Sequence, residues 1–392
     1  MPSSSRANLP EDNLLLIAAV SGRALATAAR RAGYAPCVVD FFGDLDTRAL
    51  TQSRVATIDG ARGFTSAELI DGLRQVAGGE QPIGLVYGPG FEDRTQILDE
   101  LAQYWPLLGN APQIVRRAKD PDEIAALCER LAIPHPQVRR TLPQSRDEAS
   151  DEARVSWLIK RQGGGGGGHV APAHARTPAA ADYYQQWVAG IAISALVIGD
   201  GRQAEVLGLS AQWAAPTRDQ MFRFGGAVRP AFPQPRCASQ LCDAALRIAE
   251  AFGLHGLNSI DFLVDGVNFH LIEINPRPGA TLDIFEDGEG RLLRAHIEAC
   301  RGYLPQSPLV FVGARASAIA YAREDLPFMP AIAWPDWCRD WQKPGTFVAR
   351  DEPICTLVVE ADTPVAARQK VDERRDDFLR DLTTKVGKLA AS

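Results

Sequence analysis

A short segment near the middle of the chain, Leu271-Ile-Glu-Ile-Asn-Pro-Arg-Pro-Gly279, most constrains how this sequence can fold. Side chains of an extended strand alternate between its two faces, so Ile272 and Ile274 can point into a core. Glu273 and Asn275 then share the opposite face. A carboxylate beside a carboxamide offers the oxygen ligands that Mg2+ prefers. The simpler explanation is an edge strand with a solvated polar face, and a second acid decides between the two.

That second acid, Asp261, lies on the preceding strand-like segment, residues 259–264. A two-residue turn at Asp265-Gly266 pairs Asp261 with His270 and puts it on the face opposite Glu273. A loop with an odd number of residues, or a bulge, brings both carboxylates to one face. A shared metal site therefore predicts an odd loop or a bulge, and a tight two-residue turn argues against it.

Length and composition limit the class of protein. A chain of 392 residues exceeds what one hydrophobic core usually organises, which predicts two to four subdomains. The net charge of −6 arises from interleaved acids and bases without a basic stripe, so we expect no nucleic-acid partner. We also expect no membrane association, because no apolar run approaches the length of a span. The polar N-terminus does not resemble a signal peptide, and seven scattered cysteines indicate reduced thiols, so we expect a cytoplasmic protein.

The first part of the chain alternates strand-like and helix-like segments. Residues 14–20, 36–40 and 83–87 are apolar runs typical of buried strands, separated by helical patterns. This alternation predicts a doubly wound domain with a parallel sheet, which we assign to residues 1–115. The first strand–helix turn carries one glycine, Gly22, instead of G-x-G-x-x-G, so dinucleotide binding there is poorly supported.

A run of six glycines follows a strand that ends near Lys160. Such a run is usually a flexible linker. Within one compact subdomain it can instead be a lid whose backbone N–H groups approach phosphate oxygens, with Lys160 adding a positive charge. The glycines are Gly163, Gly164, Gly165, Gly166, Gly167 and Gly168.

The order of these parts resembles the ATP-grasp superfamily, in the branch related to biotin carboxylase and to carboxylate–amine ligases. The resemblance runs from about Arg116 to Gly279. It implies a multidomain α/β and α+β protein with the ATP-grasp fold, a doubly wound parallel N-terminal domain and a small C-terminal domain. The implied divisions are an N-terminal domain at 1–115, a lid subdomain at 116–190, a metal and ATP subdomain at 191–305 and a C-terminal domain at 306–392.

The resemblance also implies roles for individual residues. Gln185 stands where the family often has Glu, so its contact with adenine is less secure than that of the Val188 backbone. Arg277 is the expected anion clamp, and we expect Arg277 and Lys160 to act in catalysis. The expected phosphate ligands are Lys119, Lys160 and the glycine run, and the expected ligands of two Mg2+ ions, with Mn2+ as an alternative, are Asp261, Glu273 and Asn275.

A further segment, residues 222–230, is aromatic, glycine-rich and doubly basic. Its arginines, Arg223 and Arg229, are candidates for binding an acidic group of the substrate. A surface loop with two solvated arginines explains either residue equally well.

Three functions remain open at this stage. The first is an ATP-dependent carboxylate–amine ligase, a carbon–nitrogen bond-forming enzyme that acts on small-molecule carboxylates and amines through an acylphosphate. The second is a carboxylase acting through carboxyphosphate; since the only methionines are Met1, Met221 and Met329, it lacks a Met-Lys-Met biotin-attachment signal and needs a separate acceptor. The third is a non-catalytic ATP-binding regulatory protein. A homodimer is one assembly that we consider.

Overall fold

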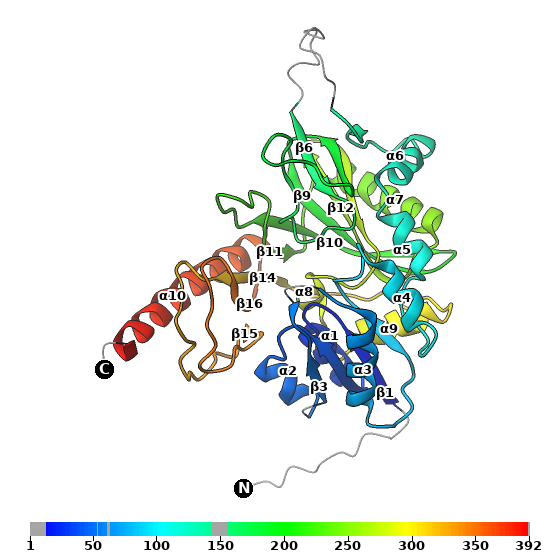
Figure 1. The fold of residues 1–392 in the computed structure, drawn as a ribbon. Helices are drawn as coiled ribbons and strands as arrows, with labels where there is room; N and C mark the ends of the chain where they lie inside the picture. The colour runs from blue at the N-terminus through cyan, green and yellow to red at the C-terminus, as the bar shows by residue number, and fades with distance from the viewer. Residues whose placement is uncertain (1–12, 53, 61–62, 143–155, 391–392) are drawn as a thin grey trace.

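The computed structural model describes residues 13–52, 54–60, 63–142 and 156–390 (Figure 1). The expectation about a signal peptide concerns residues that lie outside this description. Three sheets follow one another along the chain, a parallel one and two antiparallel ones. The structure is thus the mixed α/β and α+β arrangement that the sequence predicts.

The N-terminal sheet is parallel and has the strand order β3-β2-β1-β4. In β1, Leu15 and Ile17 belong to the core that includes α1 and α9, whereas Leu14 and Leu16 belong to the core with α3 and α4. Burial on both faces explains why the strand is apolar throughout. The elements are β1 (Leu14–Ala18), α1 (Arg23–Arg31), β2 (Ala35–Asp40), α2 (Leu45–Leu50), β3 (Val55–Thr57), α3 (Ser66–Ala77), β4 (Leu85–Tyr87) and α4 (Thr95–Leu101).

Two short helices lead from this domain into a small four-stranded antiparallel sheet, with the order β5-β8-β6-β7. Lys160 lies on β6, and the six glycines connect β6 to β7. The elements are α5 (Pro112–Ala118), α6 (Pro121–Arg130), β5 (Val138–Arg139), β6 (Trp157–Arg161), β7 (Ala171–Pro172) and β8 (Asp182–Gln186).

The largest sheet has eight antiparallel strands in the order β13-β12-β9-β10-β11-β14-β16-β15. Along β9, Ile193, Ala195 and Val197 pack in the core with α7, whereas Leu196 and Ile198 pack in the core with α9. The elements up to residue 300 are β9 (Ile191–Asp200), β10 (Ala204–Ala214), β11 (Phe224–Arg229), α7 (Pro235–Phe252), β12 (His255–Asp265), β13 (Asn268–Asn275), α8 (Leu282–Phe285) and α9 (Arg291–Cys300).

The C-terminal strands extend this sheet, because β11 pairs with β14. The long helix α10 packs on them in a core of its own. The predicted boundary at residue 306 lies before β14, the sheet continues across it, and the boundary itself stays a prediction. The elements are β14 (Ala314–Tyr321), β15 (Cys338–Arg339), β16 (Pro353–Ala361) and α10 (Pro364–Ala390).

Within the described part of the chain, none of the helices combines the length and the apolar composition needed to cross a bilayer.

Candidate functional site

The hairpin of β12 and β13 contains the bulge that a shared metal site requires. Its turn has two residues, Gly266 and Val267, between the paired Asp265 and Asn268. That tight turn alone would have argued against the site. However, the register shifts between Asp261 and Phe262, because Ile272 is an extra residue on β13. The bulge places Asp261 directly opposite Glu273.

The side chains of this hairpin form one connected polar group with a lysine from the end of α5. Lys119 Nζ donates to Glu273 Oε1 at 2.6 Å and to Asn275 Oδ1 at 3.0 Å. Asn275 Nδ2 donates to Asp261 Oδ2 at 2.9 Å. Lys119 is 154 residues from Glu273 in sequence, so the fold adds to the three hairpin residues a lysine that the sequence associated with them only through a resemblance.

The two carboxylates of the group differ in proton affinity. Burial raises the pKa of Asp261 to about 6, and the negative charge of Glu273 adds to the shift. Burial also acts to raise the pKa of Glu273, but Lys119, and after it His169 and Lys160, outweigh burial and hold the pKa at about 2. Of the two facing carboxyl groups, Asp261 therefore retains its proton to the higher pH.

The donor set fits a hard divalent cation. Asp261 Oδ1 is buried and accepts no hydrogen bond from the described residues. The Lys119 ammonium bridges Glu273 and Asn275, which shows that oxygen atoms of these two side chains converge on a positive charge. Two carboxylates and one carboxamide suit Mg2+, which takes few protein ligands and completes its shell with phosphates and water. Over the residues described, no cluster of three or more His, Cys, Asp or Glu side chains is placed to hold a metal, so a site here depends on Asn275.

Lys160 approaches this group from the small sheet. Its ammonium donates to Gln185 Oε1 at 3.0 Å. The amide oxygen of Gln185 is therefore occupied by Lys160 in this structure. Burial lowers the pKa of Lys160, and the charge of Glu273 opposes the shift. Val188 lies half-buried, two residues after the end of β8. The adenine contacts predicted for Gln185 and Val188 stay predictions.

The glycine loop lies against the neighbouring parts of the chain. Gly163 has φ +75°, and a Cβ there would lie 2.6 Å from the Glu92 carbonyl oxygen. A Cβ on Gly167, with φ +74°, would fall on the carbonyl oxygen of Phe222. The Gly166 carbonyl accepts the N–H of Phe224 at 2.9 Å. The run is thus an ordered, closed loop in this structure, and glycine is required where the backbone is left-handed and crowded.

Arg277 makes a buried ion pair with Glu92, a residue that the sequence did not single out. Arg277 Nε lies 2.6 Å from Glu92 Oε1, and both side chains are less than one-tenth exposed. Burial acts to raise the pKa of Glu92, but Arg277 and then Lys119 lower it below its ordinary value. Glu92 follows β4, at the carboxyl end of a parallel strand, where ligand sites of α/β sheets gather. The position of Glu92, just after a strand of the predicted parallel sheet, was the signal by which the sequence could have pointed to it.

The two arginines of residues 222–230 lie apart from this group. Arg223 donates to the carbonyls of Ala215 and Asp351, and its guanidinium lies 3.7 Å from the Tyr321 ring centroid. Arg229 is buried, and it donates to the carbonyl oxygens of Ile284, Val312 and Gly313. Their contacts are with the protein itself, so we do not carry them into the proposal below.

Two cavities differ in character. One of about 330 Å³ is lined by Glu92, Lys119 and Gln162 and adjoins the polar group. A larger one of about 690 Å³ lies between β10 and α10, with Trp213 and Arg368 in its wall, and contains none of the predicted site residues. We place the chemistry beside the smaller cavity, because the convergent charged groups are there.

Comparison with known proteins agrees with this architecture. Residues 125–281 match the model of an ATP-grasp domain family, ATP-grasp_3. The carbamoyl phosphate synthase large chain of Myxococcus xanthus is 22% identical over 240 residues, which are 56% of this chain and 22% of that protein. This chain therefore matches about a fifth of the length of that relative.

Solved structures resemble nearly the whole chain. The biotin carboxylase–βγ-ATP complex from Campylobacter jejuni superposes with a TM-score of 0.68 at 17% identity, covering 91% of this chain and 89% of that one. N5-carboxyaminoimidazole ribonucleotide synthetase from Thermotoga maritima gives 0.64 at 13% identity, covering 93% and 98%. At these identities the likeness concerns the fold. Together with the family match, it shows that the chain contains an ATP-grasp domain at residues 125–281.

Proposed function

We propose that this chain is an ATP-dependent ligase that joins a small-molecule carboxylate to an amine through an acylphosphate, releasing ADP and phosphate. The observation that carries the proposal is the bulged hairpin, which sets Asp261 opposite Glu273 and beside Asn275 and Lys119. This arrangement suits Mg·ATP, and its lysines suit the phosphates.

The nucleotide site follows from the contacts around this group. Asp261, Glu273 and Asn275 would hold Mg2+, which neutralises charge on the phosphates when bound. Lys119 would then exchange its contact with Glu273 for one with a phosphate, and Lys160 would contact the phosphates from the small sheet. The glycine loop would cover them and exclude water, which otherwise hydrolyses an acylphosphate.

In the reaction, a carboxylate oxygen of the substrate attacks the γ-phosphorus of ATP, and ADP leaves. The amine nitrogen then attacks the acyl carbon, the carbon–oxygen bond to phosphate breaks, and the amine loses a proton. Arg277 would orient the carboxylate, since its Nε binds Glu92 Oε1 while its Nη1 makes a long contact of 3.5 Å with the Pro278 carbonyl, which a carboxylate could replace. The Nη2 atom of Arg277 lies 3.4 Å from Asn275 Oδ1, so this clamp adjoins the metal ligands.

Hydroxylamine trapping tests the proposal. The protein is incubated with Mg·ATP, hydroxylamine and pools of carboxylates, and hydroxamate that depends on one acid identifies the first substrate. Glu273→Gln should abolish hydroxamate formation while circular dichroism shows that the variant is still folded at the assay temperature. Retained activity in Glu273→Gln would remove the metal assignment.

A carboxylase acting through carboxyphosphate is the second candidate, because two structural neighbours are named as a biotin carboxylase and a carboxyaminoimidazole ribonucleotide synthetase. ADP release that depends on bicarbonate alone would favour it. If ATP binds and no carboxylate or bicarbonate stimulates ADP release, a regulatory role replaces both enzymes.

A further inference from the structure

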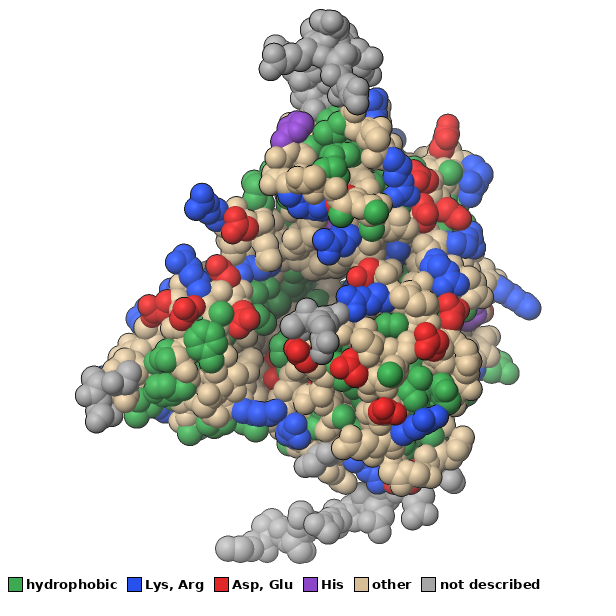
Figure 2. All heavy atoms as spheres, viewed as in Figure 1, with side chains coloured by type: hydrophobic (Ala, Val, Ile, Leu, Met, Phe, Trp, Pro, Cys, Tyr) green, Lys and Arg blue, Asp and Glu red, His purple; other side chains and the backbone are tan. Residues whose placement is uncertain are grey.

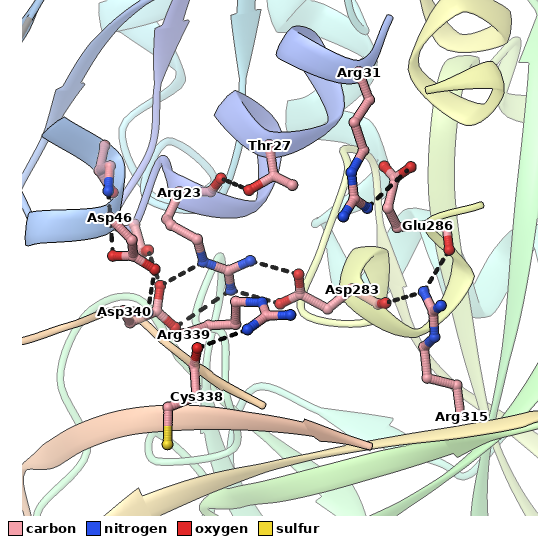
Figure 3. A network of polar contacts seen from close by, with 12 residues as sticks. Arg23, Thr27, Arg31, Asp46, Asp283, Glu286, Arg315, Cys338, Arg339 and Asp340 are labelled. Carbon is pink, nitrogen blue, oxygen red and sulfur yellow. Dashed lines mark hydrogen bonds and ion pairs between the residues drawn. The ribbon is translucent and has the colours of Figure 1, made fainter. Parts of the chain in front are cut away.

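A second charged cluster lies where the N-terminal domain meets the C-terminal strands. Arg23, at the start of α1, makes a bidentate ion pair with Asp283, at 2.5 and 2.6 Å, and a second pair with Asp340 at 2.9 Å (Figure 3). Asp283 belongs to α8 and Asp340 follows β15. One guanidinium thus joins three segments that are far apart in sequence.

Three more acids lie behind this pair, and all are buried. Asp46 accepts the backbone N–H groups of Asp340 and Trp341, at 2.9 and 3.0 Å. Asp40 accepts the backbone N–H groups of Gly22, Phe42 and Gly43. The third is Asp44, which is 3% exposed. We call Arg23, Asp40, Asp44, Asp46, Asp283 and Asp340 the acidic cluster.

Asp44 differs from the other members because it has a buried side-chain oxygen, Oδ2, without a hydrogen-bond partner in the described part of the protein. This holds although Asp44 is the N-cap residue of α2. After burial, the strongest influences on its carboxyl are the negative charges of Asp340, Asp40 and Asp46, ahead of the positive charge of Arg23. Burial and these acids raise the pKa of Asp44 to about 9.

The cations beside the cluster contact backbone oxygens instead of Asp44. Arg339 donates to the carbonyl oxygens of Asp336 and Cys338, Arg48 to that of Gly43, and Lys343 to that of Phe42. Arg23 pairs with Asp283 and Asp340 (Figure 3). A buried carboxyl group without a partner retains its proton, and a cation bound beside it would let it ionise, so an unfilled cation position is a physical explanation for this arrangement.

Two acids of the cluster are partly exposed, and one of them is close in sequence to Arg277 of the proposed reaction centre. The side chains of Asp283 and Asp340 are 14% and 20% exposed. Figure 2 shows the surface hollowed between the C-terminal elements and the N-terminal domain. Asp283 follows Arg277 by six residues, which limits the separation of their Cα atoms to about 20 Å.

We propose that the acidic cluster binds an ammonium or guanidinium group, carried by a ligase substrate in addition to its reacting carboxylate or amine. The description of the ligand as a substrate rests on the proposed function, whereas the cation site itself does not. Arg23 holds Asp283 and Asp340 in place, and the incoming cation takes the position beside Asp44.

Binding without nucleotide tests the site separately from the reaction. The probes are 1,4-diaminobutane and agmatine, with 1,4-butanediol as the uncharged analogue and Mg2+ alone as the inorganic cation, measured by isothermal titration calorimetry. The cationic probes should bind and the diol should not. Asp44→Asn should weaken cation binding about tenfold or more, because a charge-assisted hydrogen bond is lost. Binding should also release a proton, seen as a dependence of the heat on the ionisation enthalpy of the buffer.

The matched control is Asp362→Asn, which removes the same charge from an exposed position in the C-terminal part and should leave binding unchanged. Asparagine caps a helix as well as aspartate does, so Asp44→Asn should fold, and Asp44→Ser provides a second capping variant. Equal binding by the wild type and Asp44→Asn, or no binding of either amine, would overturn the proposal. Asp44-dependent binding of Mg2+ without amine binding would overturn it as well. Hydroxamate formation reports on the ligase reaction independently of these outcomes.

Discussion

Alanine at Gly163 or at Gly166 places the same methyl group on the same loop in two different surroundings. Both glycines have a left-handed backbone, with φ +75° and +66°, so the substitution costs about 1–2 kcal/mol of conformational strain at either position. At Gly163 the new Cβ would also lie 2.6 Å from the Asp93 Cα and from the Glu92 carbonyl oxygen. At Gly166 no described heavy atom beyond its chain neighbours lies within 4 Å. Gly166→Ala is therefore the control for strain.

The overlap at Gly163 involves backbone atoms, which cannot rotate away, so the loop must move off residues 92–93. Overpacking of this kind costs about 1–3 kcal/mol. If bound nucleotide requires the closed loop, Gly163→Ala should bind Mg2+ with a non-hydrolysable ATP analogue roughly 5- to 150-fold more weakly than Gly166→Ala does. Isothermal titration calorimetry measures the two dissociation constants, and circular dichroism should show that both variants are folded at the assay temperature.

Equal dissociation constants for the two variants would refute the reasoning, because they would show that contact of the loop with residues 92–93 does not accompany nucleotide binding. The comparison needs no knowledge of the substrates. It therefore tests the lid independently of the reaction.

Three other variants test the remaining contacts. Glu92→Gln should lower the free energy of unfolding by about 3–5 kcal/mol, since it leaves the buried Arg277 unpaired, whereas Asp99→Asn, in an exposed pair, should change it by less than about 1 kcal/mol in denaturant titrations. The folded chain retains a proton on Asp44 that the unfolded chain releases above about pH 4. The free energy of unfolding should therefore fall as the pH rises from about 4 towards 9, and Asp44→Asn should make it depend less on pH in denaturant titrations. Arg229→Met should lower the free energy of unfolding by about 2 kcal/mol or more, because it leaves buried carbonyl oxygens without a hydrogen-bond donor. Unchanged stability together with weaker substrate binding would instead support the prediction that Arg229 binds the substrate.

Much of the fold could be predicted because its signals are local. The apolar run at residues 14–18 is buried on both faces of a parallel sheet, as its composition indicates. Ile274 is buried in the core and Glu273 and Asn275 share one polar group, as the alternation predicts, whereas Ile272 is the extra residue of the bulge and is only half-buried. The same alternation required an odd loop or a bulge, and the hairpin has the bulge.

The position of the bulge could not be predicted, because neither Ile272 nor its neighbours carry a glycine or proline that marks an irregularity. The pairing of Arg277 with Glu92 spans 185 residues and depends on how two domains pack. The same is true of Arg23, which lies 260 residues from Asp283. Local patterns hold no information on such contacts, so these residues became visible only in the folded chain.

The transfer of oxygen from the carboxylate to phosphate tests the central claim most directly. Once hydroxamate trapping has identified the acid, it is prepared with 18O in its carboxyl group and incubated with the protein, Mg·ATP and the amine. An acylphosphate route predicts that one 18O atom appears in the released phosphate for each amide formed, as measured by mass spectrometry. Amide formation with unlabelled phosphate would contradict the account.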